Sequence, residues 1–260
     1  MKTLEQEIRR CIEDGKKAFI PYIMAGDGGL DSLHEKILFL QEIGVTAIEI
    51  GIPFSDPVAD GEVIQKAGER SIALGTTLRK VLYTLSSFKE EVHVPVIIMS
   101  YLNPILSIGA TEFVEICQAS GVSGLIVPDL PLEESALLAA VLEEKDIALI
   151  QLVSLTSSTE RIKRIAENAE GFIYAVTVKG ITGIRKGFDS DLSSYLERIK
   201  QNSPVPVLAG FGVSFPEHIE QLNHSADGVI VGSAIVDAFY REDRSMIQQL
   251  VNASIQRSNY

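Results

Sequence analysis

The sequence predicts a (β/α)8 barrel with an extra N-terminal helix, and the prediction rests on three observations. Short apolar segments rich in β-branched residues alternate with longer segments whose apolar residues recur every three or four positions. This alternation is typical of a parallel sheet covered by helices. The repeating units number eight, are evenly spaced, and lack a glycine-rich dinucleotide fingerprint after the first apolar segment. We therefore favour a closed barrel over an open sheet of six or seven Rossmann-like units, which stays the alternative.

The elements follow one another in a regular order. Before residue 19, Leu4, Ile8 and Ile12 recur on one face, which predicts the extra helix. Segments such as 32–43 and 133–144 have the spacing of helices that cover a sheet, the second with Leu137 and Leu138 turned inward. The predicted strands are residues 19–25, 47–50, 94–101, 124–127, 148–153, 172–176, 205–209 and 228–231.

Composition and charge limit the classes of function. Hydrophobic residues make up 46% of the 260-residue chain, so it can bury a large core as a single domain over residues 1–260. The formal net charge of −12 disfavours binding to nucleic acid and to anionic membranes. The two cysteines, Cys11 and Cys117, have no metal-ligand spacing and are expected to be buried thiols. The N-terminus lacks an apolar leader, and no apolar run is long enough to span a bilayer, so we expect a cytoplasmic protein.

Carboxylates at and after the second predicted strand are the first candidates for chemistry. Glu49 stands between two isoleucines, where an isolated charge is costly to bury, unless its side chain points outward. Asp56 and Asp60 follow in a loop rich in proline and glycine, where each alone would favour turn chemistry. In a barrel the active site lies at the carboxyl ends of the strands, so Glu49 and a loop aspartate can face one pocket. Two carboxylates in unlike surroundings can divide acid and base roles.

Glycines after the later strands predict a phosphate site. Gly210 and Gly212 follow the seventh strand, and Gly232 with Ser233 follows the eighth. Glycines let backbone N–H groups approach a ligand, and helix N-termini add donors and partial positive charge. Many (β/α)8 enzymes bind phosphate at this place, although each glycine alone could simply make a tight turn.

Two further features suit a small phosphorylated substrate with a flat ring. The loop over residues 177–188 is long and glycine-bearing, as expected of a lid that closes over substrate, while its basic residues could steer an anion but are more simply explained as solvated surface. Tyr22, Tyr101, Tyr174 and Phe211 fall at or near strand ends, and together they would form an apolar slot for a ring, although each alone would suit a core.

Other classes of catalytic site find no support. The four histidines fall in helices or before strands, where we expect surface positions, so no nucleophilic triad is predicted. No metal-ligand cluster is predicted, and no lysine lies inside a strand to form a Schiff base.

The motifs together resemble those of tryptophan synthase α subunits along nearly the whole chain. They are PYIMAGD (21–27), IEIGIPFSDPVADG (48–61), VPDLP (127–131), GITG (180–183), GFGVS (210–214) and GVIVGSAIV (228–236). The resemblance implies a lyase of tryptophan biosynthesis that cleaves indole-3-glycerol phosphate to indole and glyceraldehyde 3-phosphate by carboxylate acid/base catalysis. Because a barrel alone is shared by many functions, the implication rests on the motifs.

The resemblance also assigns roles to residues. It matches Glu49 and Asp60 to the catalytic carboxylates, the first exchanging protons with the substrate and the second bonding the indole N–H. It implies substrate contacts for Tyr22, Tyr101, Tyr174, Thr182 and Phe211. It implies phosphate contacts for Gly183, Gly212, Gly232 and Ser233.

A partner is implied as well. The family's α subunits pair with a β subunit as an α2β2 heterotetramer, in which pyridoxal phosphate belongs to the β subunit and this chain needs no cofactor. Two alternatives remain open. One is a sugar-phosphate isomerase or epimerase on a similar barrel, and the other is a subunit without turnover that activates its partner.

Overall fold

Nine parallel strands form the centre of the molecule in a computed structural model that describes residues 1–177, 190–210, 212 and 215–255. They are β1 (Ala18–Met24), β2 (Ile48–Gly51), β3 (Val96–Met99), β4 (Val122–Ile126), β5 (Ala148–Leu149), β6 (Gln151–Ser154), β7 (Ile173–Val176), β8 (Val207–Gly210) and β9 (Gly228–Val231). Their spatial order is β5-β4-β3-β2-β1-β9-β8-β7-β6.

The ring of strands closes through a broken strand. β5 and β6 lie at the two ends of the hydrogen-bonded order, yet only Ile150 separates them in the chain. The Ile150 N–H still donates to the Leu125 carbonyl at 2.9 Å, while β6 has moved on to pair with β7. The predicted strand over 148–153 is therefore one barrel strand interrupted at Ile150. Counted this way the barrel has eight strands, which confirms the (β/α)8 prediction and excludes the open sheet.

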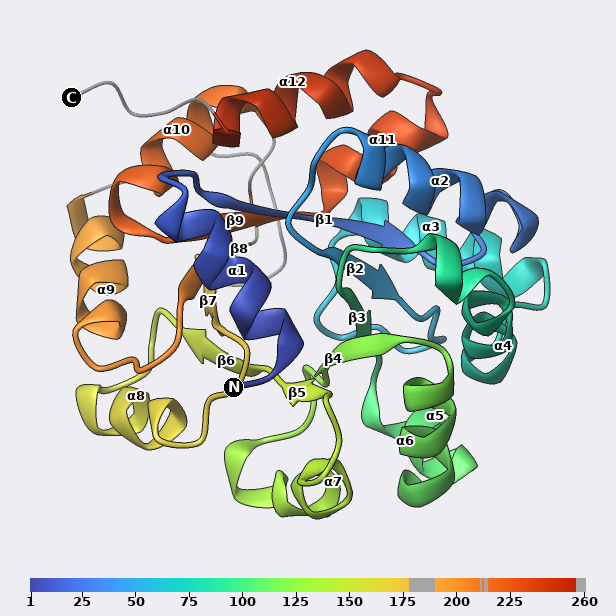
Figure 1. The fold of residues 1–260 in the computed structure, drawn as a ribbon, viewed down its shortest axis with the longest axis horizontal. Helices are drawn as coiled ribbons and strands as arrows, with labels where there is room; N and C mark the ends of the chain where they lie inside the picture. Colours follow the sequence, from blue (N-terminus) through green and yellow to red (C-terminus); the bar gives the residue numbers. More distant parts are fainter. Residues whose placement is uncertain (178–189, 211, 213–214, 256–260) are drawn as a thin grey trace.

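Helices surround the strands (Figure 1). They are α1 (Thr3–Glu13), α2 (Asp31–Glu42), α3 (Glu62–Ala73), α4 (Leu78–Phe88), α5 (Leu102–Ile108), α6 (Ala110–Ala119), α7 (Ala136–Leu142), α8 (Thr159–Ala166), α9 (Ser190–Lys200), α10 (Pro216–Ser225), α11 (Ser233–Tyr240) and α12 (Arg244–Ile255), with 3-10 turns η1 (Lys89–Glu91) and η2 (Leu132–Glu134). The helix expected over 133–144 is thus shorter, because its start is the turn η2. Leu138 faces the core as predicted, but Leu137 is 46% exposed.

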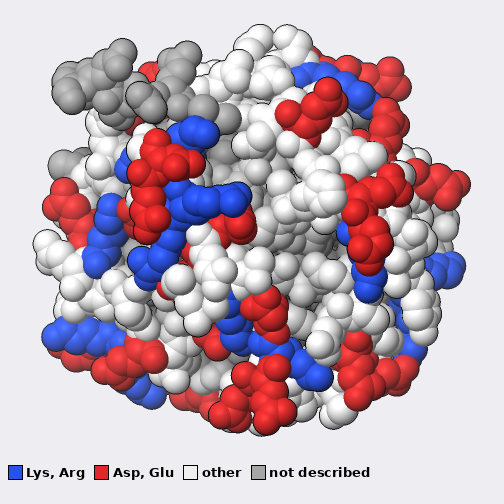
Figure 2. Space-filling view, viewed as in Figure 1, with Lys and Arg blue, Asp and Glu red and all other residues white. Residues whose placement is uncertain are grey.

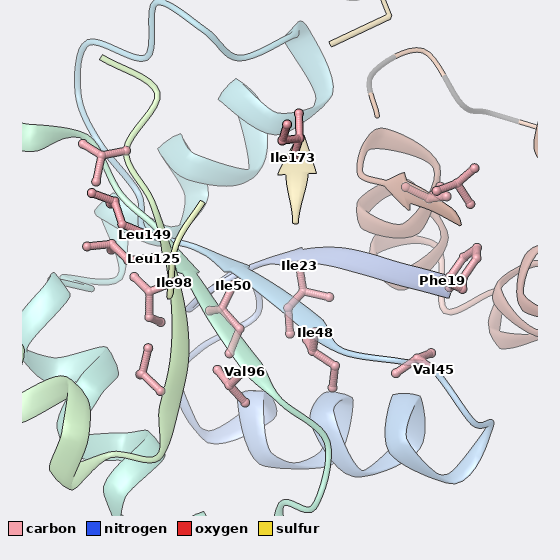
Figure 3. Packing of buried hydrophobic residues seen from close by; sticks show 14 of the residues in the cluster. Phe19, Ile23, Val45, Ile48, Ile50, Val96, Ile98, Leu125, Leu149 and Ile173 are labelled. Carbon is pink, nitrogen blue, oxygen red and sulfur yellow. The ribbon is translucent and has the colours of Figure 1, made fainter. Parts of the chain in front are cut away.

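Alternation along the strands separates two apolar cores. In β1, Phe19 and Ile23 belong to the layer between strands and helices, part of which Figure 3 shows. Ile20 and Tyr22 instead belong to a second cluster, the barrel interior. Successive side chains of a strand point to opposite faces, so every barrel strand contributes to both layers.

The extra helix α1 closes one end of this interior. Its Leu4 and Ile8 are fully buried and belong to the interior cluster. A Cβ placed on Gly124 would lie 2.9 Å from the Leu4 side chain, so the small residue in β4 makes room for the helix. Burial of each of these side chains stabilises the fold by roughly 1.5–3 kcal/mol. The other end of the barrel, at the strand carboxyl ends, holds the loops considered next.

Candidate active site

Glu49 points into the barrel from the middle of β2. Its neighbours Ile48 and Ile50 belong to the outer layer, so alternation turns Glu49 to the interior, beside its register partner Tyr22 of β1. Glu49 is 0% exposed. An outward-facing strand carboxylate, the simpler reading of this residue, is therefore excluded.

The Glu49 carboxyl group is buried without compensation. Within the described residues, neither of its oxygens has a hydrogen-bond partner. Burial, and secondly the charge of Asp60, raises the pKa of Glu49 from 4.5 to about 8. The group is thus mainly protonated at neutral pH, and it is a proton donor held among the apolar side chains of the barrel interior. Buried polar groups without partners are rare, and a reacting group is one of the recognised reasons for them.

Asp60 lies at the end of the loop that joins β2 to α3. Its side chain is half-buried, and burial raises its pKa to about 6, while a hydrogen bond from Tyr101 opposes the rise. Asp60 is therefore mainly ionised at neutral pH. The two carboxyl groups thus occupy unlike environments and hold opposite protonation states, the arrangement in which two carboxylates can divide acid and base roles.

Asp56, the other candidate in this loop, belongs to a turn. Its side chain is exposed and accepts a hydrogen bond from the Ser55 hydroxyl at 2.5 Å. Its carbonyl accepts from the Val58 N–H at 2.9 Å. The turn interpretation therefore holds for Asp56.

Three tyrosines surround the carboxyl pair. Tyr22, Tyr101 and Tyr174 are each at most 6% exposed, and they come from β1, the end of β3 and β7. The pKa of Tyr22 lies well above its usual range because of burial and, after it, the charges of Asp60 and Glu49. The pKa of Tyr174 is raised by burial and by the same two carboxylates. Both rings therefore lie in the electrostatic neighbourhood of the pair.

Tyr101 ties the second loop to the barrel. Its hydroxyl accepts a hydrogen bond from the Ala59 N–H at 2.9 Å, next to Asp60. Its ring stacks on Phe54 with centroids 5.0 Å apart. Nothing in the spacing of Phe54 and Tyr101 along the sequence indicates this stacking, so it could not be predicted.

Two glycines make space for the tyrosine rings. A Cβ on Gly51 would lie 1.8 Å from the Tyr22 hydroxyl oxygen. A Cβ on Gly210 would lie 2.3 Å from the Tyr174 ring. Gly51 was not singled out from the sequence. Gly210 was considered as a place where a ligand could approach or where the chain makes a tight turn, and its close contact with Tyr174 is a further reason for a glycine there.

The predicted phosphate residues lie at two loop positions. Gly212 has a φ of +80°, a conformation that strongly favours glycine. Gly232 precedes α11, which begins at Ser233 without a side-chain cap on its first N–H groups. A Cβ on Gly232 would lie 3.8 Å from Tyr22 and 3.9 Å from Ile64. The N-terminus of α11, with donors that suit an anion, thus lies beside Tyr22, the register partner of Glu49.

Three of the predicted site residues lie outside the part of the chain that the structure describes. They are Thr182, Gly183 and Phe211, of which the first two belong to the predicted lid. Thr177, the first residue of the predicted lid, is described; it is buried, and its hydroxyl donates to the Gly210 carbonyl at 2.8 Å.

Several other expectations concern residues away from Glu49 and Asp60. Cys117 is buried as expected, but Cys11 is only partly buried. The expectation of surface histidines is wrong for His218, which is 9% exposed because α10 turns it inward. Among the described side chains, no group of three or more is placed to hold a metal ion. No described helix has the length and apolar character needed to span a membrane.

Comparison with known proteins agrees with the geometry. The family model of the tryptophan synthase alpha chain matches residues 8–259. A tryptophan synthase alpha chain of Bacillus thuringiensis is 49% identical over 252 residues, which cover 97% of this chain and 98% of the relative. A tryptophan synthase structure from Mycobacterium tuberculosis superimposes with a TM-score of 0.91 at 31% identity, covering 98% of both chains. The alpha subunit from Legionella pneumophila gives 0.86 at 33% identity, covering 97% of this chain and 98% of that one. The chain belongs to the tryptophan synthase alpha chain family.

Proposed function

We propose that this chain cleaves indole-3-glycerol phosphate to indole and glyceraldehyde 3-phosphate, a step in tryptophan biosynthesis, with Glu49 and Asp60 as its catalytic groups. The observation that carries the proposal is the unpaired Glu49 carboxyl group in the barrel interior, beside an ionised Asp60. Glu49 supplies a proton donor, and Asp60 supplies a fixed negative charge beside it.

The protonation states suit the order of bond changes. Indole is a poor leaving carbanion until its C3 carries a proton, so the reaction begins with protonation. Neutral Glu49 gives its proton to C3, and the positive charge that develops on the ring is stabilised by Asp60, which accepts a hydrogen bond from the indole N–H. Ionised Glu49 then takes the proton of the glycerol hydroxyl beside the breaking bond. The C–C bond breaks, its electron pair returns to the ring, and Glu49 ends protonated as it began.

The remaining residues of the site hold the substrate. Tyr22, Tyr101 and Tyr174 would border the indole ring, with Phe211 and Thr182 completing the site on closure. Gly212, Gly232 and Ser233, together with Gly183, would receive the phosphate through backbone N–H groups. Local dipoles of this kind let a protein with a net charge of −12 hold an anion. The proton transfers described above take place between Glu49 and the substrate, so they need no cofactor in this chain. We assign pyridoxal phosphate to the β partner.

We also propose that a β subunit docks on the face formed by the β2–α3 loop and α5, giving an α2β2 assembly. Val58 in this loop is 77% exposed, and Leu106 on α5 is 47% exposed. Leu106 also lines a groove of about 750 Å3, together with Pro53, Phe54 and Pro104, among others. Because Phe54 stacks on Tyr101, a partner on this face would contact the catalytic loop directly.

The docking proposal has a matched control. Leu106→Asp should weaken association with a tryptophan synthase β subunit at least tenfold, because a charge would be buried in an apolar contact. Leu137→Asp alters a leucine of nearly equal exposure, 46%, on α7. Equal affinity of the two variants in sedimentation or titration calorimetry would place the partner elsewhere.

The reaction is tested by supplying substrates to the purified chain. We expect indole release from indole-3-glycerol phosphate, and a faster release when a β subunit is added. Conversion of a sugar phosphate without indole release would favour the isomerase alternative. Activation of the β subunit without any indole release by the folded chain would favour the non-catalytic subunit.

A further inference from the structure

A second buried charged group lies near the end of β1, apart from the carboxyl pair. Asp27 is 8% exposed, and both its oxygens accept hydrogen bonds from Arg70 of α3, at 2.7 Å from Nε and 2.7 Å from Nη2. A bidentate carboxylate–guanidinium pair fixes the relative orientation of the two groups it joins. The mechanism proposed above uses neither residue.

The ion pair is one of three ties at a tight joint between the end of β1 and the last turns of α3. The Ser71 hydroxyl, 0% exposed, donates to the Ala25 carbonyl at 2.5 Å. Gly26 has a φ of +77°, and a Cβ there would lie 2.7 Å from the hydroxyl oxygen of Ser71 on α3. The carboxyl-terminal end of α3 is therefore held against β1 at close range.

The same pair reaches the end of α11. The Arg70 guanidinium lies 4.2 Å from the ring centroid of Tyr240, the last residue of α11. At their other ends the two helices also meet, because a Cβ on Gly232 would be 3.9 Å from Ile64 of α3. Thus α3 and α11 run side by side in the same direction, with Arg70 joining their carboxyl-terminal ends.

The amino-terminal ends of these two helices carry the two halves of the proposed site. Asp60 lies two residues before α3, and its carbonyl accepts from Gln65 of that helix at 2.8 Å. Gly232 and Ser233 begin α11. The spacing between the second carboxylate and the phosphate end therefore depends on how the two helices are held together.

A small change in the angle between α3 and α11 would displace Asp60 enough to lower the reaction rate. Arg70 and Asp60 are ten residues apart, about 15 Å along a helix at about 1.5 Å per residue. A tilt of about 5° at the Arg70 end would move Asp60 by roughly 1 Å, and a misplacement of that size costs on the order of 100-fold in rate. A partly buried ion pair contributes little to stability compared with apolar residues of similar size, so geometry is the stronger reason for its presence.

We propose that Asp27 and Arg70 are positioning residues that set the distance between the phosphate end and the carboxylate end of the site. The proposal rests on the function proposed above. It predicts that the two halves of the substrate bind normally when the pair is broken, while the whole substrate, which must span both ends, does not.

The experiment compares the whole substrate with its halves. Affinities for glycerol 3-phosphate, indole and indole-3-glycerol phosphate are measured by titration calorimetry in the Glu49→Gln background, so that the whole substrate stays intact. Arg70→Met is expected to weaken binding of the whole substrate at least tenfold and each half by less than about twofold, and to lower kcat by 10- to 100-fold in the otherwise native chain. Arg70→Lys, which keeps the charge but not the bidentate bond, should lie between.

Arg244→Met is the matched control. Arg244 also pairs with a carboxylate, Glu35, and lies 4.9 Å from the Phe39 ring centroid, but it joins α12 to α2. It should leave all three affinities unchanged. If Arg70→Met does not fold, Asp27→Asn serves in its place, because it keeps an acceptor oxygen and the side-chain size. It should likewise weaken binding of the whole substrate more than binding of either half.

Two results would overturn the proposal. One is an unchanged affinity for the whole substrate in Arg70→Met and Asp27→Asn, and the other is an equal loss for the halves and the whole. A wild-type chain without indole release would refute the proposed function separately, because the binding comparison does not depend on turnover.

Discussion

Replacing Glu49 with glutamine should change how the stability of this protein depends on pH. The wild-type carboxyl group has a pKa of about 8 in the fold and an ordinary value of 4.5 when the chain is unfolded. Between these two values the folded protein holds a proton that the unfolded chain releases. Stability from this group is therefore fully present below pH 4.5 and is lost as pH rises toward 8. Glutamine has nearly the same shape but no proton to lose.

The size of the effect follows from the pKa difference. Each pKa unit corresponds to about 1.4 kcal/mol, so the free energy of unfolding of the wild type should fall, relative to Glu49→Gln, by at most about 5 kcal/mol between pH 4.5 and pH 9. About 3 kcal/mol of this fall should already have occurred when the pH reaches 7. The raised pKa of Asp60, about 6, adds a further fall at lower pH in both proteins and cancels in the comparison.

Urea unfolding at closely spaced pH values measures this difference. The gap between the two proteins should widen from pH 5 to pH 8, whatever constant offset the amide introduces. Glu62→Gln is the control, because Glu62 is an exposed residue paired with Lys66, and its gap from the wild type should stay flat over that range. A flat gap for Glu49→Gln as well would show that Glu49 is not held protonated, and the reasoning about its burial would be wrong.

Three further outcomes concern activity. The pH profile of kcat/KM should be bell-shaped, rising through about pH 6 as Asp60 ionises and falling through about pH 8 as Glu49 loses its proton; a rate that is flat across this range would contradict the assigned protonation states. Asp60→Asn should lower kcat by roughly 100- to 1000-fold in the isolated chain because charge stabilisation is lost, whereas Asp56→Asn, in the exposed turn, should not, as steady-state indole release would show. Gly212→Val should raise KM and the inhibition constant of inorganic phosphate at least tenfold, whereas Gly15→Val, with a similar φ of +74° and open space around it, should alter stability alone.

The order of strands and helices in the barrel could be predicted from the sequence. The reason is that the residues each element buries recur with a regular spacing along the chain. The isoleucines on both sides of Glu49 marked it as a costly carboxylate to bury, but its direction, into the barrel or outward, stayed open until the structure showed the side chain in the interior. The helical spacing of Leu4 and Ile8 predicted α1 and its buried face. The break at Ile150 carried no such signal, since its residues are as apolar as those of an unbroken strand. It arises from the hydrogen-bond pairing of β5 and β6 with different neighbours.

Contacts between distant segments account for most of what the sequence did not reveal. Asp27 and Arg70 are 43 residues apart, and each alone resembles an ordinary surface charge. The stacking of Phe54 on Tyr101 joins residues 47 positions apart by number, on a loop and at a strand end. The glycines Gly51 and Gly210 were visible as glycines, but the tyrosine rings they accommodate come from other strands. Pairwise contacts of this kind are set by the closed barrel and leave no local pattern.

Charge distribution also needed the structure. A net charge of −12 suggested a surface unsuited to nucleic acid. On the face seen in Figure 2, acidic and basic side chains are interspersed, and no continuous basic surface crosses its described residues.

The most direct test of the central claim is indole release from indole-3-glycerol phosphate by the wild type and by Glu49→Gln, measured on proteins shown to be folded under the same conditions. We predict that the glutamine variant loses at least about 100-fold in kcat, the scale of a general acid–base contribution, while it still binds the substrate. Comparable rates in the two proteins would contradict the assignment of Glu49 as the group that exchanges the proton.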